Sequence, residues 1–149
     1  MGAKLDLTRR ETDREPRSQY AALPWRLDAD GAVQVLLITS RETRRWVIPK
    51  GWPIKGIGSK MSAAREAFEE AGVAGQMGKK LGLYHYQKRL RSGRIQPVRV
   101  AVYPLLVALE HADWPEKGQR EKHWLRPDEA SVLVEEPELQ AIIAAFRPL

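Results

Sequence analysis

Residues 51–73 read GWPIKGIGSKMSAAREAFEEAGV, and this stretch decides which fold we expect for the chain. Glu66, Glu69 and Glu70 have the spacing i, i+3, i+4, which places their side chains on adjacent turns of one helix face. Three like charges this close repel one another, and such an arrangement usually holds a cation between them. Because the chain has no cysteine, its oxygen ligands favour a hard ion, Mg²⁺ or Mn²⁺, over zinc.

The other side of the same helix is predicted to be buried. A spacing of i, i+3, i+4, i+7 relates Ala64, Ala67, Phe68 and Ala71. Apolar residues with this spacing form one stripe of an amphipathic helix, so we expect the stripe to pack against a sheet. The preceding residues, 50–59, are rich in glycine and predict a loop.

This stretch resembles the Nudix box, the signature of hydrolases that cut a diphosphate linked to another group. Seven positions of the pattern are matched at the required spacing, namely Gly51, Arg65, Glu66, Glu69, Glu70, Gly72 and Val73. Ala67 stands at a position where the pattern has an aliphatic residue. The first glutamate of the pattern is replaced by Ile57.

The resemblance implies the Nudix fold, an α+β arrangement in the form of an α/β/α sandwich. A mixed central sheet would carry the catalytic helix and the C-terminal helices packed on it. Three phrases, QYAALPWR, LLITSRETRRWVIPKGWP and WPEKGQREKHWLRPDEA, resemble one branch of the family. That branch includes diphosphoinositol polyphosphate phosphohydrolases, diadenosine polyphosphate hydrolases and small bacterial members.

The rest of the chain predicts strands alternating with turns, followed by two helices. Predicted strands cover residues 19–27, 32–39, 46–48, 81–90, 95–109 and 120–125. Predicted helices cover residues 60–71, a segment opening at 126–129, and 136–146. The apolar run within 32–39 predicts a strand buried on both faces. Residues 1–17 are polar and charged, which predicts a flexible tail before one domain at 18–149.

Composition narrows the class of protein further. The 149 residues are 43% hydrophobic, which is enough for one domain with a core. No apolar run approaches the roughly 20 residues that cross a bilayer, and the first residues contain no signal-peptide core, so we expect a cytoplasmic protein without membrane contact. The net charge of +6 favours a polyanionic partner, either nucleic acid or a small molecule with many phosphates.

The resemblance assigns roles to the residues of the box. Glu66, Glu69 and Glu70 would hold one to three divalent ions against the diphosphate, with Gly51 in the loop before the helix. Glu70 is the first choice for the general base, since family members often use one residue of the pair Glu69 and Glu70, and Arg65 would orient the glutamates. Glu121, on a late predicted strand, is a second candidate as base or metal ligand; the alternative is an exposed strand glutamate paired with Arg120 or Lys122.

Two basic segments flank the predicted helix in sequence. Residues 41–60 contain six cations and one acid, and residues 84–100 contain five cations and no acid. Candidate substrate-binding residues in these segments are Arg41, Arg44, Lys50, Lys55 and Arg89. Arginine and lysine bind phosphate well, although a solvated loop and hairpin would have the same composition.

Three functions are consistent with these features. The leading hypothesis is a Mg²⁺- or Mn²⁺-dependent hydrolase of a small, highly phosphorylated substrate. An RNA 5′-end or nucleotide pyrophosphohydrolase is the alternative within the same class, and the absence of an aromatic-rich RNA platform ranks it lower. A Nudix-fold binding module without catalysis is the alternative from another class, and Ile57 is its sequence argument. The oligomeric state does not follow from the sequence.

Overall fold

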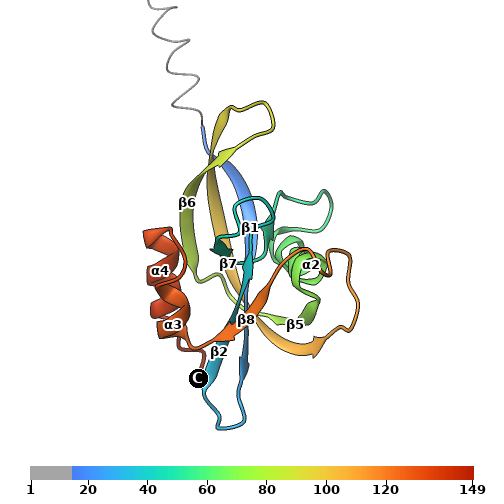
Figure 1. Cartoon of the computed structure of the whole chain (residues 1–149), viewed down its shortest axis with the longest axis vertical. Coiled ribbons are helices and arrows are strands. Elements are labelled where there is room, and N and C mark those ends of the chain that lie inside the picture. Colours follow the sequence, from blue (N-terminus) through green and yellow to red (C-terminus); the bar gives the residue numbers. More distant parts are fainter. Residues whose placement is uncertain (1–14) are drawn as a thin grey trace, which may run out of the picture.

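The computed structural model describes residues 15–149, which form one mixed sheet between helices (Figure 1). The strands are β1 (Arg17–Leu27), β2 (Val33–Thr39), β3 (Trp46–Val47), β4 (Lys50–Gly51), β5 (Val73–Met77), β6 (Gly82–Arg89), β7 (Ile95–Glu110) and β8 (Lys122–Leu125). The helices are α2 (Ser59–Ala71), α3 (Pro127–Ser131) and α4 (Pro137–Ala144).

The sheet is organised around β1 and β7, which pair in parallel from Arg17 opposite Val98 to Trp25 opposite Leu106. All other pairings are antiparallel: β1 with β2 and β4, β2 with β3 and β8, and β7 with β5 and β6. The short strand β4 joins β1 through Tyr20 opposite Gly51 and Ala21 opposite Lys50. This pairing brings the residues just before the predicted catalytic helix to the centre of the sheet.

The two faces of the sheet carry two separate cores. One core contains Ala63, Ala67 and Ala71 of α2. The other contains residues of α3 and α4, including Ala130, Leu139 and Ile143. Figure 1 accordingly shows α2 on one side of the strands and α3 and α4 on the other. The predicted α+β sandwich with a mixed sheet is therefore confirmed.

The predicted buried stripe of the central helix is partly confirmed in the structure. Ala67 and Ala71 are buried as expected, but Ala63 takes the place of Ala64, which is only half-buried. Phe68 is also half-buried and packs edge-on against His111, with ring centroids 5.0 Å apart. A stripe of alanines lets the helix backbone approach the sheet closely, and the larger Phe68 remains at the margin of the contact.

Most predicted elements agree with the structure, and two strands were not predicted: β4, which falls within the predicted loop 50–59, and β5. β2 is buried on both faces, with side chains from Val35 to Ile38 fully enclosed. β5 follows α2 directly and was missed because VAGQM has neither alternation nor a long apolar run. The predicted tail lies mostly outside the described residues, and its last residue, Arg17, begins β1. The single domain at 18–149 stays a prediction.

None of the helices within residues 15–149 is long and apolar enough to cross a membrane.

The end of α2 is closed by a glycine in contact with a tryptophan. Gly72 has φ 70° and its N–H donates to the Phe68 carbonyl at 2.9 Å, which ends the helix in a left-handed turn. A Cβ at this position would lie 2.5 Å from the ring of Trp114. Trp114 belongs to the segment between β7 and β8, so Gly72 determines how closely that segment packs on the helix.

We predict that Gly72→Ala destabilises the fold more than Gly31→Ala, because both glycines have positive φ but only Gly72 contacts a side chain. The positive φ costs about 1–2 kcal/mol in each variant. Overpacking against Trp114 should add about 1–3 kcal/mol for Gly72→Ala. Urea unfolding of both variants measures the difference, and equal midpoints would contradict the Trp114 contact.

Candidate active site

The site begins where β4 meets the side chain of Glu66 on α2. A Cβ on Gly51 would lie 2.3 Å from Cδ of Glu66, so only glycine lets this carboxylate lie against the strand. The intervening loop is held by Ser62, whose hydroxyl accepts from the Ile54 N–H at 3.2 Å and donates to the Gly58 carbonyl at 2.7 Å. The predicted loop position Gly51 therefore has a steric reason.

Glu66 and Glu70 form a partly desolvated pair of like charges. Burial and then repulsion from Glu70 raise the pKa of Glu66 to about 8. Glu69 and Glu116 add further repulsion on Glu66. Burial also raises the pKa of Glu70, against the attraction of Arg120 and Lys50. The carboxylates therefore lie in an environment that favours an added positive charge.

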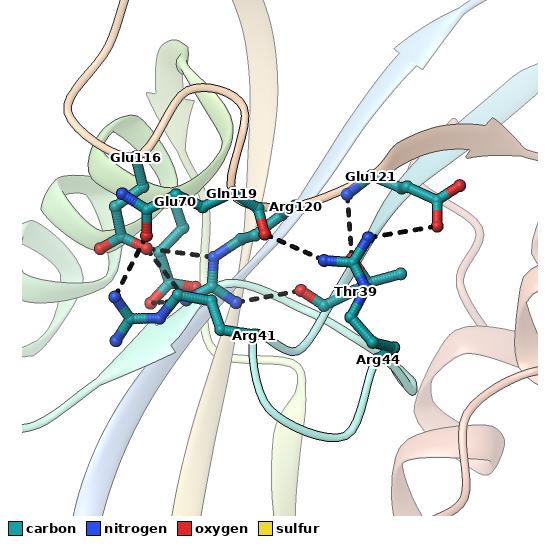
Figure 2. Close-up of polar contacts among 8 residues, drawn as sticks. All are labelled: Thr39, Arg41, Arg44, Glu70, Glu116, Gln119, Arg120 and Glu121. Atoms are coloured by element: carbon teal, nitrogen blue, oxygen red, sulfur yellow. Dashed lines mark hydrogen bonds and ion pairs between the residues drawn. The ribbon is translucent and has the colours of Figure 1, made fainter.

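Arg120 is the cation that contacts this cluster directly, as Figure 2 shows. Its guanidinium donates to Oε1 of Glu116 from Nε at 3.1 Å and from Nη2 at 3.0 Å, and Nη2 lies 3.8 Å from Oε2 of Glu70. Nη1 donates to the Thr39 carbonyl at 3.1 Å. The Arg120 side chain is only 9% exposed, so its charge is held in place between the two carboxylates.

The segment between β7 and β8 is fastened to α2 by backbone bonds. The Glu116 N–H donates to the Glu69 carbonyl at 3.0 Å, and the His111 N–H donates to the Gly72 carbonyl at 2.7 Å. These bonds place Glu116 beside the carboxylates of α2. Neither Glu116 nor Arg120 was predicted as a site residue: Glu116 falls in a polar segment with no periodic signal, and Arg120 was expected at the start of a strand, as an ion-pair partner of Glu121.

The donor chemistry of the cluster fits a hard divalent ion, because buried carboxylates that repel one another are stabilised by such a cation. In the part of the chain that the structure describes, no three acidic or histidine side chains already form a metal-binding group. Glu70 is paired with Arg120 instead. The metal-ligand roles of Glu66, Glu69 and Glu70 stay predictions.

Glu121 lies apart from this cluster. Its side chain is 60% exposed, and Oε2 of its carboxylate lies 3.5 Å from Nη2 of Arg44. Its backbone is bonded to β2, since the Glu121 N–H donates to the Thr39 hydroxyl at 2.9 Å. The ion-pair alternative considered above therefore has a partner in the structure, Arg44 rather than Arg120 or Lys122. Its metal-ligand role stays a prediction.

The predicted basic residues divide into two groups. Lys50 is half-buried, and burial lowers the pKa of its ammonium to about 8 against the attraction of Glu70. Its Nζ lies 5.2 Å from the centroid of the Tyr86 ring. Lys50 is thus the predicted cation that the structure brings to the carboxylates.

The remaining predicted cations are exposed. Arg41 donates to the Gln119 side chain at 3.2 Å, and Arg44 donates to the Gln119 carbonyl at 3.1 Å. Arg89 donates to the Gly93 carbonyl at 3.2 Å within its own hairpin turn. Arg65 and Lys55 also have exposed side chains. The predicted roles of these residues rest on the sequence.

We predict that Glu66→Gln stabilises the metal-free protein at alkaline pH. The folded-state pKa of about 8 lies above the ordinary 4.5, so stability present below 4.5 is lost as pH rises toward 8. The glutamine variant should lack this loss, because it cannot ionise. Thermal unfolding in chelator between about pH 5 and about pH 8.5 measures it.

The exposed Glu42→Gln is the control for that measurement and should follow wild type at every pH. Parallel pH profiles of wild type and Glu66→Gln would contradict the desolvated pair.

Comparison with known proteins identifies a family and related sequences. The NUDIX domain model matches residues 17–146. Nudix hydrolase 16, mitochondrial, from Arabidopsis thaliana is 37% identical over 101 residues, covering 66% of this chain and 56% of that protein. Diphosphoinositol polyphosphate phosphohydrolase 2 from Rattus norvegicus is 32% identical over 126 residues, covering 81% of this chain and 65% of that protein.

The fold has a counterpart among solved structures. The crystal structure of C. elegans Ap4A hydrolase superposes with a TM-score of 0.61 at 17% identity, covering 87% of this chain and 95% of that one. The chain itself spans only 56% and 65% of the two curated relatives. Because the domain model covers nearly all of the described residues, the chain belongs to the NUDIX domain family.

Proposed function

We propose that this protein is a divalent-metal-dependent hydrolase that cleaves a diphosphate linkage. The observation that carries the proposal is the pair of half-buried Glu66 and buried Glu70 on a helix that matches the family signature, with Arg120 and Lys50 presented to it by other elements. A fold that only needed a surface helix would gain nothing from placing two repelling carboxylates against the sheet.

The residues of the site have distinct chemical tasks in this proposal. A bound Mg²⁺ or Mn²⁺ would neutralise phosphate oxygens and acidify the attacking water. Glu66 and Glu70 would hold the ion, with Glu69 completing the set. Glu70 is the proposed general base, which takes a proton from the water as its oxygen bonds to phosphorus and the bridging P–O bond breaks.

The proposed substrate is a small, highly phosphorylated molecule of the diphosphoinositol polyphosphate or dinucleoside polyphosphate type. Two of the similar proteins are named for these substrates, and the net charge of +6 suits a polyanion. Lys50 is the proposed first phosphate contact, because its ammonium lies near Glu70 and the Tyr86 ring. Arg41 and Arg44 would extend the positive surface from the connection between β2 and β3.

We predict that Glu70→Gln lowers turnover at least about 100-fold while preserving the fold. The substitution keeps the shape of the side chain and removes the charge. A phosphate-release screen with Mg²⁺ should cover dinucleoside polyphosphates, diphosphoinositol polyphosphates, nucleoside diphosphate sugars, triphosphates and 5′-triphosphate RNA. Glu42→Gln is the matched control on an exposed loop and should remain active.

The screen separates the proposed function from its alternatives. Preferred cleavage of the RNA would favour the 5′-end enzyme, and activity on no substrate would favour a binding module. Faster cleavage of a diphosphate sugar than of any polyphosphate would contradict the proposed substrate class.

A second prediction concerns the position where the family pattern has glutamate. Ile57 is half-buried in the loop before α2, and its N–H donates to the Ile54 carbonyl at 3.4 Å. We expect Ile57→Glu to change kcat/KM only modestly, within about tenfold, because the remaining carboxylates already form the cluster. A gain from undetectable to robust hydrolysis would instead identify the natural protein as a disabled enzyme.

A further inference from the structure

Arg120 occupies an unusual position for an arginine, because its charge is enclosed among carboxylates. Three of its contacts are made at 3.0–3.1 Å, to Oε1 of Glu116 and to the Thr39 carbonyl, and the side chain is 9% exposed. An arginine in this environment is fixed by its partners, and it cannot lose its proton to relieve a nearby cation.

The elements around Arg120 hold it independently of any substrate. Thr39 ends β2, and the Glu121 N–H donates to the Thr39 hydroxyl at 2.9 Å directly after Arg120 in the chain. The Thr39 N–H in turn donates to the Glu121 carbonyl at 3.1 Å. The guanidinium is therefore presented to Glu70 and Glu116 by the sheet, before a metal or a phosphate arrives.

A divalent ion bound by Glu70 would lie close to the fixed positive charge of Arg120. The Arg120 Nη2 lies 3.8 Å from Oε2 of Glu70, so an ion that takes the same carboxylate would be repelled by Arg120 across a short distance. The same guanidinium offers charge-assisted hydrogen bonds to Glu116 when Glu70 is withdrawn. Arg120 can thus remain bound while Glu70 changes partner.

We propose that Arg120 is a resident counter-cation of the carboxylate cluster, which bridges Glu70 and Glu116 in the metal-free protein and weakens metal binding by holding Glu70. The proposal rests on the metal-dependent function proposed above for this site. It makes Arg120 a positioning residue: it acts on the metal through Glu70 and Glu116. A consequence is that the bare site binds metal weakly and takes it more readily together with an anionic phosphate group.

The test measures Mn²⁺ binding to the metal-free full chain. Binding is measured by calorimetry and by the loss of the signal of free Mn²⁺ in electron paramagnetic resonance. Arg120→Gln should bind Mn²⁺ about tenfold more tightly than wild type, because one neighbouring positive charge is removed. Its turnover should fall, because Glu116 loses its partner. A merely structural arginine would give weaker metal binding and weaker turnover together.

Two variants control for charge and geometry. Arg26→Gln removes an equal charge from an exposed pair with Glu110 and should leave the Mn²⁺ affinity unchanged. Arg120→Lys keeps the charge near the carboxylates and should bind Mn²⁺ within about threefold of wild type. Unchanged or weakened Mn²⁺ binding by folded Arg120→Gln would overturn the proposal.

A measurement on the wild type covers the case in which Arg120→Gln does not fold. The Arg120 Nη2–H resonance should shift on addition of Mg²⁺, because Nη2 loses its contact with Glu70 while it keeps Glu116. An unchanged resonance at saturating Mg²⁺ would overturn the proposal. If wild type binds no divalent ion at this site, the proposed function itself fails, which is distinguishable from a failure of the Arg120 proposal alone.

Discussion

Repulsion between Glu66 and Glu70 is the constraint around which the site is built. Both carboxylates are drawn away from water by the approach of α2 to the sheet, and burial is the largest cause of the raised pKa of each. The alanine stripe permits that approach, and Gly51 leaves room for Glu66 against β4. The surrounding cations are then arranged by other elements: Lys50 comes from β4 and Arg120 from the end of the connection that follows β7. Removing either cation would leave more of the negative charge on the helix without compensation.

The mixed sheet explains why such distant segments meet. Parallel pairing of β1 with β7 puts the first and the longest strands side by side, and β4 joins the edge of β1 that β2 leaves free at Tyr20 and Ala21. The chain therefore reaches the start of α2 from the middle of the sheet. At the other end of the same helix, the chain passes directly through Gly72 into β5 without a loop. The carboxylates are held between these two attachments, so their positions depend on the sheet more than on the helix alone.

Much of this architecture follows from local sequence, and the parts that do not are long-range. The spacing of Glu66, Glu69 and Glu70 and the positions of Gly51 and Gly72 indicated a loop, a helix and an acidic face. One member of the buried stripe was misassigned, because Ala63 and Ala64 are equally small and only the sheet distinguishes them. Arg120 and Glu116 were missed because their importance comes from contacts with Thr39 and α2. Arg89 is bonded to the carbonyl of its own hairpin turn, and its predicted substrate role stays a prediction.

The connection between β7 and β8 carries two members of the cluster on one stretch of about ten residues. It contains no helix or strand, and it is attached to α2 by the Trp114 contact with Gly72, the His111 contact with Phe68, the ion pair of Arg120 with Glu70, and two backbone bonds. Such a segment can open by local unfolding while the sheet remains intact. Opening would withdraw Glu116 and Arg120 together, since both are on the same segment. A single protease cut in this connection would therefore remove Glu116 and Arg120 from the carboxylates of α2 while the sheet remains folded.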